Sequence, residues 1–81
     1  MSYYVFYRKK NELKETPYIG NVSNLIRMKL DIESLYRCRD MRSKIDDIIE
    51  WRIYDENVNL LEIGVVTPTV KGKEVSWFEG V

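Results

Sequence analysis

The chain has 81 residues, with 13 basic and 13 acidic side chains and no histidine. This length predicts one domain, residues 1–81, and a hydrophobic content of 44% excludes an intrinsically disordered chain. Zero net charge excludes a strongly basic nucleic-acid binder and an acidic nucleic-acid mimic. The single cysteine, Cys38, cannot form an intramolecular disulfide, and no apolar run is long enough to cross a membrane. We therefore expect a cytoplasmic protein without membrane contact.

The N-terminal run at residues 2–9, SYYVFYRK, predicts a β-strand because β-branched and aromatic residues dominate it. Strand alternation places Tyr4 and Phe6 on one face, and both faces are apolar near the start of the run. After a polar turn, residues 13–19 predict a weaker return strand. Pro17 cannot donate a ladder hydrogen bond, so we expect this strand at an edge of the sheet.

Residues 26–32 fit two secondary structures. Their apolar side chains alternate with charged ones at period two, which predicts a strand with one solvated face. The alternative is that the helix predicted for the following residues extends back to Ser23, because Leu25, Met28 and Ile32 also fit helical spacing. We favour the strand, and this choice decides how many strands the sheet contains.

The longest helical pattern covers residues 34–51. Apolar residues recur there every three or four positions, which places them on one helix face at about 100° per residue. This face would cover a sheet, with Ile45 and Ile48 as core anchors and Cys38 as a small buried hydrophobe. The apolar positions are Leu35, Cys38, Met41, Ile45, Ile48 and Ile49.

Two β-rich runs follow the predicted helix and meet in a turn around Asn57, a residue type that tolerates a left-handed backbone. Gly72 marks a second hairpin, after which Trp77 and Phe78 would point to opposite faces. Gly64 lies inside a strand-like run, which indicates a bulge or a close approach of the backbone to other atoms.

Together these elements predict the α+β class. One amphipathic helix would pack on a four- to five-stranded, mostly antiparallel sheet. A single helix covers only one sheet face, so we expect the other face to stay free.

The chain lacks the residues that most enzymes and metal sites use. It has no histidine, one cysteine and no cluster of ligands at metal spacing, so we expect neither a catalytic nucleophile pair nor a zinc site. Its four glycines form no phosphate-binding motif. We therefore predict no catalytic residues, no metal and no cofactor.

Two groups of residues are candidates for binding. Basic residues crowd positions 27–44, and the chain has ten aromatic residues, six of them Tyr, more than a core of this size must bury. Tyr, Trp and Arg dominate protein-interface hot spots, and aromatic side chains also stack on unpaired bases. The predicted partner-binding residues are Tyr4, Arg37, Arg39, Arg42, Trp51, Tyr54 and Trp77.

The favoured function is a small non-catalytic protein that modulates or inhibits a protein partner. The absence of Ala and Gln, with frequent Lys, Asn, Ile and Tyr, indicates an AT-rich genome and is associated with phage or mobile-element accessory proteins. The alternative is a single-stranded nucleic-acid-binding module that uses surface Tyr, Trp, Arg and Lys. The sequence leaves a homo-oligomer open.

Overall fold

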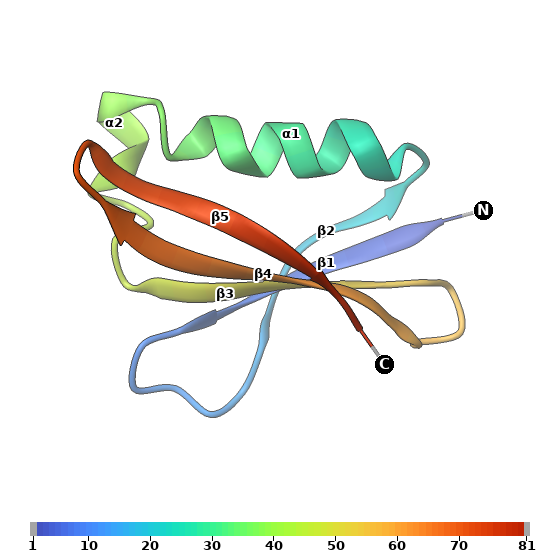
Figure 1. Ribbon diagram of the computed structural model, residues 1–81. Coiled ribbons are helices and arrows are strands. Elements are labelled where there is room, and N and C mark those ends of the chain that lie inside the picture. Colours follow the sequence, from blue (N-terminus) through green and yellow to red (C-terminus); the bar gives the residue numbers. More distant parts are fainter. Residues whose placement is uncertain (1, 81) are drawn as a thin grey trace.

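The computed structural model describes residues 2–80, so the two ends of the predicted domain, Met1 and Val81, lie outside the described residues. Five strands form one antiparallel sheet, and helix α1 lies across one of its faces (Figure 1). The α+β class and the five-stranded sheet are therefore confirmed. In chain order the elements are β1 (Tyr3–Lys9), β2 (Thr16–Val22), α1 (Leu25–Leu35), α2 (Arg39–Arg42), β3 (Ile48–Tyr54), β4 (Leu60–Thr69) and β5 (Gly72–Glu79).

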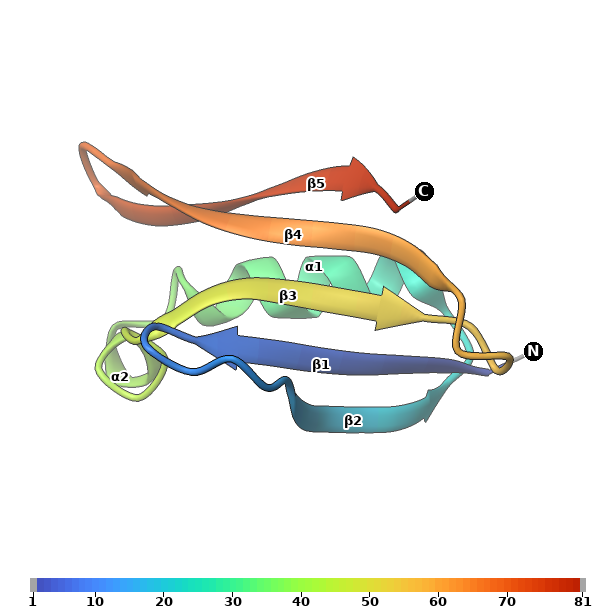
Figure 2. The same cartoon turned by 90° about the horizontal axis from the view of Figure 1, so that it is seen from below.

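The strand order is β2-β1-β3-β4-β5, so β2 and β5 form the two edges of the sheet. Figure 2 looks onto the sheet from the side opposite α1, with the five strands side by side in this order. The connection from β2 to β3 carries both helices over one face and returns the chain beside β1. As a result, β3 is the central strand and has neighbours on both sides.

Helix α1 corrects the strand that the sequence favoured for this segment, and it confirms the helical alternative for these residues, although the helix ends at Leu35. The two patterns coincide because residues four apart share a helix face, while residues two apart share a strand face. Met28 and Ile32 lie four apart and are buried against the sheet. Ile26 and Leu30 also lie four apart, and both are exposed on the outer side of the helix. The period-two alternation in the sequence therefore arises because two different helix faces both carry apolar residues, one face buried and the other exposed.

Local contacts fix the start of α1 and its position on the sheet. Asn24 is the N-cap, and its side chain accepts a 3.0 Å hydrogen bond from the backbone N–H of Arg27, which satisfies one of the free donors of the first turn. Further along, Lys29 Nζ lies 2.7 Å from Glu62 Oε1 on β4 and 5.5 Å from the centre of the Trp77 ring on β5. These contacts connect the helix to β4 and β5 through one long side chain.

The predicted helix at residues 34–51 is wrong. α1 ends at Leu35, α2 is a single turn of four residues, and β3 begins at Ile48. The β-branched and aromatic residues after position 47 favour a strand, and pairing with both β1 and β4 satisfies its backbone hydrogen bonds. Cys38, which was expected in the core, is exposed in the connection between the two helices.

The core lies between α1 and the sheet, with Trp51 of β3 at its centre and without exposed surface. Its indole Nε1 donates a 2.9 Å hydrogen bond to the hydroxyl of Tyr36, the C-cap residue of α1. The ring centroids of Tyr7 and Tyr18 lie 5.5 and 5.0 Å from the centroid of the indole ring. Burial raises the pKa of Tyr36, and the hydrogen bond from Trp51 offsets part of that rise. The buried residues are Val5, Met28, Ile32, Tyr36, Ile45, Ile48, Trp51, Ile53 and Val75.

Gly64 on β4 shows the close approach, one of the two alternatives that the sequence left open. It pairs in register with Trp51 on one side and Trp77 on the other, so no bulge occurs at this position. An added Cβ would lie 2.7 Å from both the Trp77 ring and the Val75 side chain, closer than such contacts allow. The missing side chain therefore lets β5 pack its large residues over β4.

Replacing Ile45 by Ala should lower the free energy of unfolding by about 2–4 kcal/mol, because this side chain is only 7% exposed and its removal leaves a cavity. Ile26 provides a matched control, since it is 72% exposed on α1. Ile26→Ala should change the free energy of unfolding by less than about 0.5 kcal/mol. Chemical denaturation of the three proteins measures both effects, and equal midpoints for Ile45→Ala and the unsubstituted protein would contradict the burial of Ile45.

Candidate functional site

The sheet surface opposite α1 carries the residues that alternate with the core positions. Val5 and Trp51 point toward α1, so their neighbours along each strand point away from it. One row of such residues crosses all five strands in register, with Arg52 at its middle. We define the helix-free face as this row, Pro17, Phe6, Arg52, Ile63 and Phe78, together with the adjacent row Arg8, Glu50, Val65 and Ser76 and the pair Tyr4 and Tyr54.

An ion-pair network occupies the centre of the helix-free face. Glu50 Oε1 accepts hydrogen bonds from Arg8 Nε at 2.9 Å and from Arg52 Nε at 3.0 Å. Arg52 Nη1 also lies 3.8 Å from Glu15 Oε2. Burial by itself raises the pKa of Glu50, but the hydrogen bonds and positive charges of Arg8 and Arg52 outweigh it, and the net pKa lies below the ordinary glutamate value. Both arginines on this face are therefore already neutralised by carboxylates.

An aromatic hollow of about 280 Å³ opens beside this network, toward the turn between β3 and β4. The rings of Phe6 and Tyr54 meet edge to face, with centroids 5.4 Å apart, and Tyr4 completes the aromatic wall. The hydroxyl of Tyr54 donates a 2.7 Å hydrogen bond to Glu15 Oε2. Burial and this bond to a carboxylate raise the pKa of Tyr54. The hollow is lined by Tyr4, Phe6, Tyr54, Asp55, Glu56 and Val58.

The rim of the hollow is acidic and strained. Asp55 accepts hydrogen bonds from the backbone N–H groups of Asn57 and Asn59 at 2.8 and 2.9 Å. These bonds lower the pKa of Asp55, and the bond from Asn59 has the largest effect. The left-handed residue of the turn is Val58, with φ of 63°, and not Asn57 as the sequence predicted. A β-branched residue in this conformation is uncommon and costs about 1–2 kcal/mol. Val58 is nevertheless 73% exposed, so no core contact accounts for its side chain.

The structure separates the residues that were predicted to bind a partner. Tyr4 and Tyr54 come together in the hollow. Trp51 has no exposed surface, so its predicted contact with a partner is corrected to a role in the core. Trp77 packs against the core on the helix side of the sheet, where Lys29 covers its ring. Its buried Nε1 has no hydrogen-bond partner within residues 2–80.

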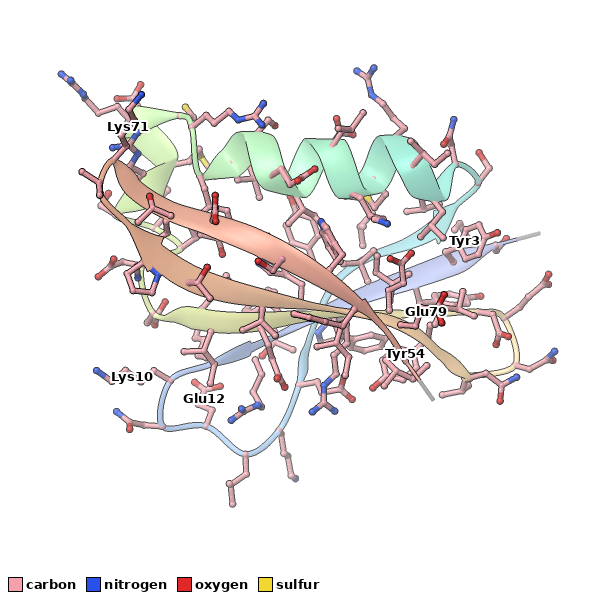
Figure 3. All side chains as sticks on the ribbon, viewed as in Figure 1. Tyr3, Lys10, Glu12, Tyr54, Lys71 and Glu79 are labelled. Carbon is pink, nitrogen blue, oxygen red and sulfur yellow. The ribbon has the colours of Figure 1, made fainter. Side chains whose placement is uncertain are left out.

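The three predicted arginines are exposed at the end of the molecule that also holds the turn between β4 and β5. Arg39 and Arg42 are the first and last residues of α2, and Arg37 lies just before this helix. Figure 3 labels Lys71 of this turn close to α2, whereas Tyr54 lies on the side of the sheet away from α1. The three arginines therefore belong to a different surface from the aromatic hollow.

The surface around α2 carries charges of both signs. A cleft of about 380 Å³ there is lined by four basic residues but also by two carboxylates. Lys73 is already engaged, because its Nζ lies 3.0 Å from Asp46 Oδ1. The structure therefore offers no uniformly basic groove at this end. The charged residues of the cleft are Arg37, Arg42, Lys71, Lys73, Glu33 and Glu74.

Sequence reasoning left Phe6, Arg52, Val58 and Phe78 out of the candidate residues. Strand alternation already placed Phe6 beside Tyr4, and that signal could have identified it. Arg52 lies in the β-rich run directly after the predicted helix, and the sequence did not show which face of the sheet its side chain occupies. The exposure of Val58 and Phe78, at 73% and 57%, follows from turn geometry and strand register, which no local pattern specifies.

Within residues 2–80 no three His, Cys, Asp or Glu side chains are placed to hold a metal ion. Neither described helix has the length and apolar character needed to cross a membrane. The described surface offers an aromatic hollow, an acidic rim and an arginine network neutralised by carboxylates.

Replacing Glu50 by Gln should flatten the dependence of stability on pH in acid. The lowered pKa of Glu50 means that its ionised form stabilises the fold at any pH above the ordinary glutamate pKa. This stabilisation is lost as pH falls below the ordinary value and through the lower pKa of the folded state. The variant should start from a lower free energy of unfolding at pH 7 and lose less of it between pH 5 and about pH 3. Glu56→Gln, at an exposed turn position, should follow the unsubstituted protein; a Glu50→Gln curve parallel to it would contradict the network.

Comparison with known proteins adds no assignment to this geometry. No family model matches the chain, and no curated protein or solved structure matches it either. A functional conclusion for this protein therefore depends on its own residues and contacts.

Proposed function

We propose that this protein is a non-catalytic binding protein that modulates or inhibits a protein partner, and that it engages the partner through the helix-free face. The partner segment carries an apolar side chain flanked by Lys or Arg. The observation that carries the proposal is the aromatic hollow with its acidic rim and the exposed Val58. Its walls suit the apolar side chain, and its rim suits the basic flanks.

The apolar part of the proposal rests on the hollow and its surroundings. Tyr4, Phe6 and Tyr54 form three of its walls, and aromatic side chains provide large contact area at low cost in conformational entropy. Val58 adds an exposed apolar group that is held there in an unfavourable backbone conformation. Strain of this kind concentrates at binding and switch sites, because selection for stability alone would remove it.

The electrostatic part of the proposal rests on the carboxylates around the hollow. Asp55 is fixed by the turn that it organises, and Glu56 next to it is exposed. Glu15 lies behind Tyr54 and accepts its hydroxyl hydrogen bond. This negative rim attracts a basic segment and repels a phosphate backbone.

A protein partner is favoured over nucleic acid because the cations on the helix-free face are already engaged. Arg8 and Arg52 both bind Glu50, so neither is free to neutralise phosphates without breaking an ion pair. Absence of histidine from the sequence supports a non-catalytic role, and the lone Cys38 supports a reducing, cytoplasmic setting.

Val58→Asn tests the proposal, because it should change stability and binding in opposite directions. Asn tolerates the left-handed backbone, so the variant should gain about 1 kcal/mol in free energy of unfolding. The same change removes the apolar group from the rim and should weaken partner binding. The measurement is a selection from a random peptide library with the protein as bait, followed by calorimetric titration of the enriched peptides.

Enriched peptides should contain an aromatic or aliphatic residue flanked by Lys or Arg, and Val58→Asn should bind them about tenfold more weakly. Val70→Asn is the matched control, because Val70 is another exposed turn valine, at the β4–β5 turn. Val70→Asn should leave affinity unchanged. Enrichment of acidic peptides, or equal affinity for the two variants, would contradict the proposed site.

Single-stranded nucleic-acid binding is the second candidate, supported by the aromatic side chains that the helix-free face exposes. We expect only weak binding to single-stranded DNA or RNA near 0.15 M salt, falling further as salt rises, because few free cations face the aromatic residues. Fluorescence anisotropy with labelled oligonucleotides measures this affinity. Submicromolar binding at this salt that is lost in Tyr4→Ala would reverse the order of the two candidates.

A further inference from the structure

The two edges of the sheet differ in how well they are protected against pairing. Three features make edge strand β2 irregular and so protect it from pairing. It contains Pro17, its register with β1 shifts twice, and Asn21 has a left-handed backbone with φ of 57°. β5 pairs with β4 through eight consecutive residue pairs without a shift, and it contains no proline. An unprotected edge presents a row of free N–H and C=O groups to another strand. The open edge of this sheet is therefore β5.

We propose that a second copy of this chain pairs with β5 in antiparallel register, with the two-fold axis at Ser76, to form a continuous ten-stranded sheet. Five strands come from each copy, and both α1 helices lie on the same face. β5 forms the outer border of the sheet in Figure 2, with α1 lying behind the inner strands, so α1 leaves this edge uncovered. This inference goes beyond the proposed function and does not depend on it.

Charge complementarity within β5 selects this register. With Ser76 opposite itself, Lys73 of one copy lies opposite Glu79 of the other, and the two-fold axis repeats the pair. Both residues are on the helix side of the sheet, since they are six positions apart in one strand. Lys73 Nζ contacts the backbone oxygen of Asp46 at 2.7 Å and its Oδ1 at 3.0 Å, which leaves the third ammonium proton for Glu79 of the second copy.

Apolar cross-strand pairs support the same register. Val75 of one copy lies opposite Trp77 of the other, and both side chains already border the core of their own copy. Phe78, 57% exposed at the edge of the helix-free face, lies opposite Glu74 and packs along its stem. Pairing at β5 therefore extends the existing core and covers one of the largest exposed aromatic side chains.

A single-cysteine crosslink tests the position of the two-fold axis. In a Cys38→Ser background, Ser76→Cys places two thiols directly opposite each other, with Cβ atoms about 5 Å apart, and mild oxidation should give a covalent dimer quickly. Glu74→Cys is the matched control on the same strand and the same face. Its two thiols would be about 13 Å apart along the strands, so its crosslinking should be at least about tenfold slower.

Charge exchange tests the register independently. Glu79→Lys leaves the contact between Lys73 and Asp46 in place but opposes two lysines across the axis, and it should weaken the dimer about tenfold by analytical ultracentrifugation. Lys73→Glu combined with Glu79→Lys should restore dimerisation, and circular dichroism confirms that each variant is folded. A monomer at every concentration, equal crosslinking at positions 74 and 76, or a charge exchange that fails to restore the dimer would overturn the inference.

Discussion

The fold depends on the contact between Trp51 and Tyr36. Trp51 lies on the central strand without exposed surface, and the one polar atom of its side chain, Nε1, donates a hydrogen bond to the Tyr36 hydroxyl at the end of α1. A buried indole N–H without a partner would be costly, so this bond determines where the helix must end relative to the sheet. Two tyrosine rings pack against the same indole. One aromatic cluster thus joins the helix, the central strand and the β2 edge.

This cluster also explains why the two faces of the sheet differ. Val5 on β1 and Trp51 and Ile53 on β3 fill the core on the helix side, and Gly64 allows Val75 and Trp77 of β5 to pack there. The residues that alternate with them form a surface of rings and neutralised arginines, which needs no second layer of structure to satisfy its polar groups. Such a sheet is well suited to binding. The face under α1 holds the buried core and provides stability, so the residues of the helix-free face can contact a partner without being needed for folding.

The three surface features with a proposed or candidate binding role lie outside the core, each on a different part of the molecule. The acidic rim and Val58 belong to the β3–β4 turn, the exposed arginines surround α2, and the open edge is β5. Backbone strain and exposed apolar surface both lower the free energy of unfolding of the monomer. The fold tolerates them at these positions because the core is complete without these residues. Binding at the hollow and pairing at β5 use different atoms, so a dimer of this chain would carry two hollows at a distance from its two-fold axis.

The sequence by itself determined the N-terminal strand and both C-terminal turns, because each depends on residues near one another in the chain. It also predicted the α+β class, and Pro17 indicated that β2 is an edge strand. At Gly64 it left a bulge and a close approach open, and the packing of Val75 and Trp77 decided for the close approach. Tertiary structure decided which segment became the helix. Residues 25–35 and 34–51 both carry apolar spacing compatible with a helix, and the Asn24 cap and the pairing of β3 between β1 and β4 favour the first. The hollow likewise joins β1 to β3 and its turn, more than forty residues apart in the chain. Local patterns specify which face a residue occupies, but only strand order and register specify which residues meet there.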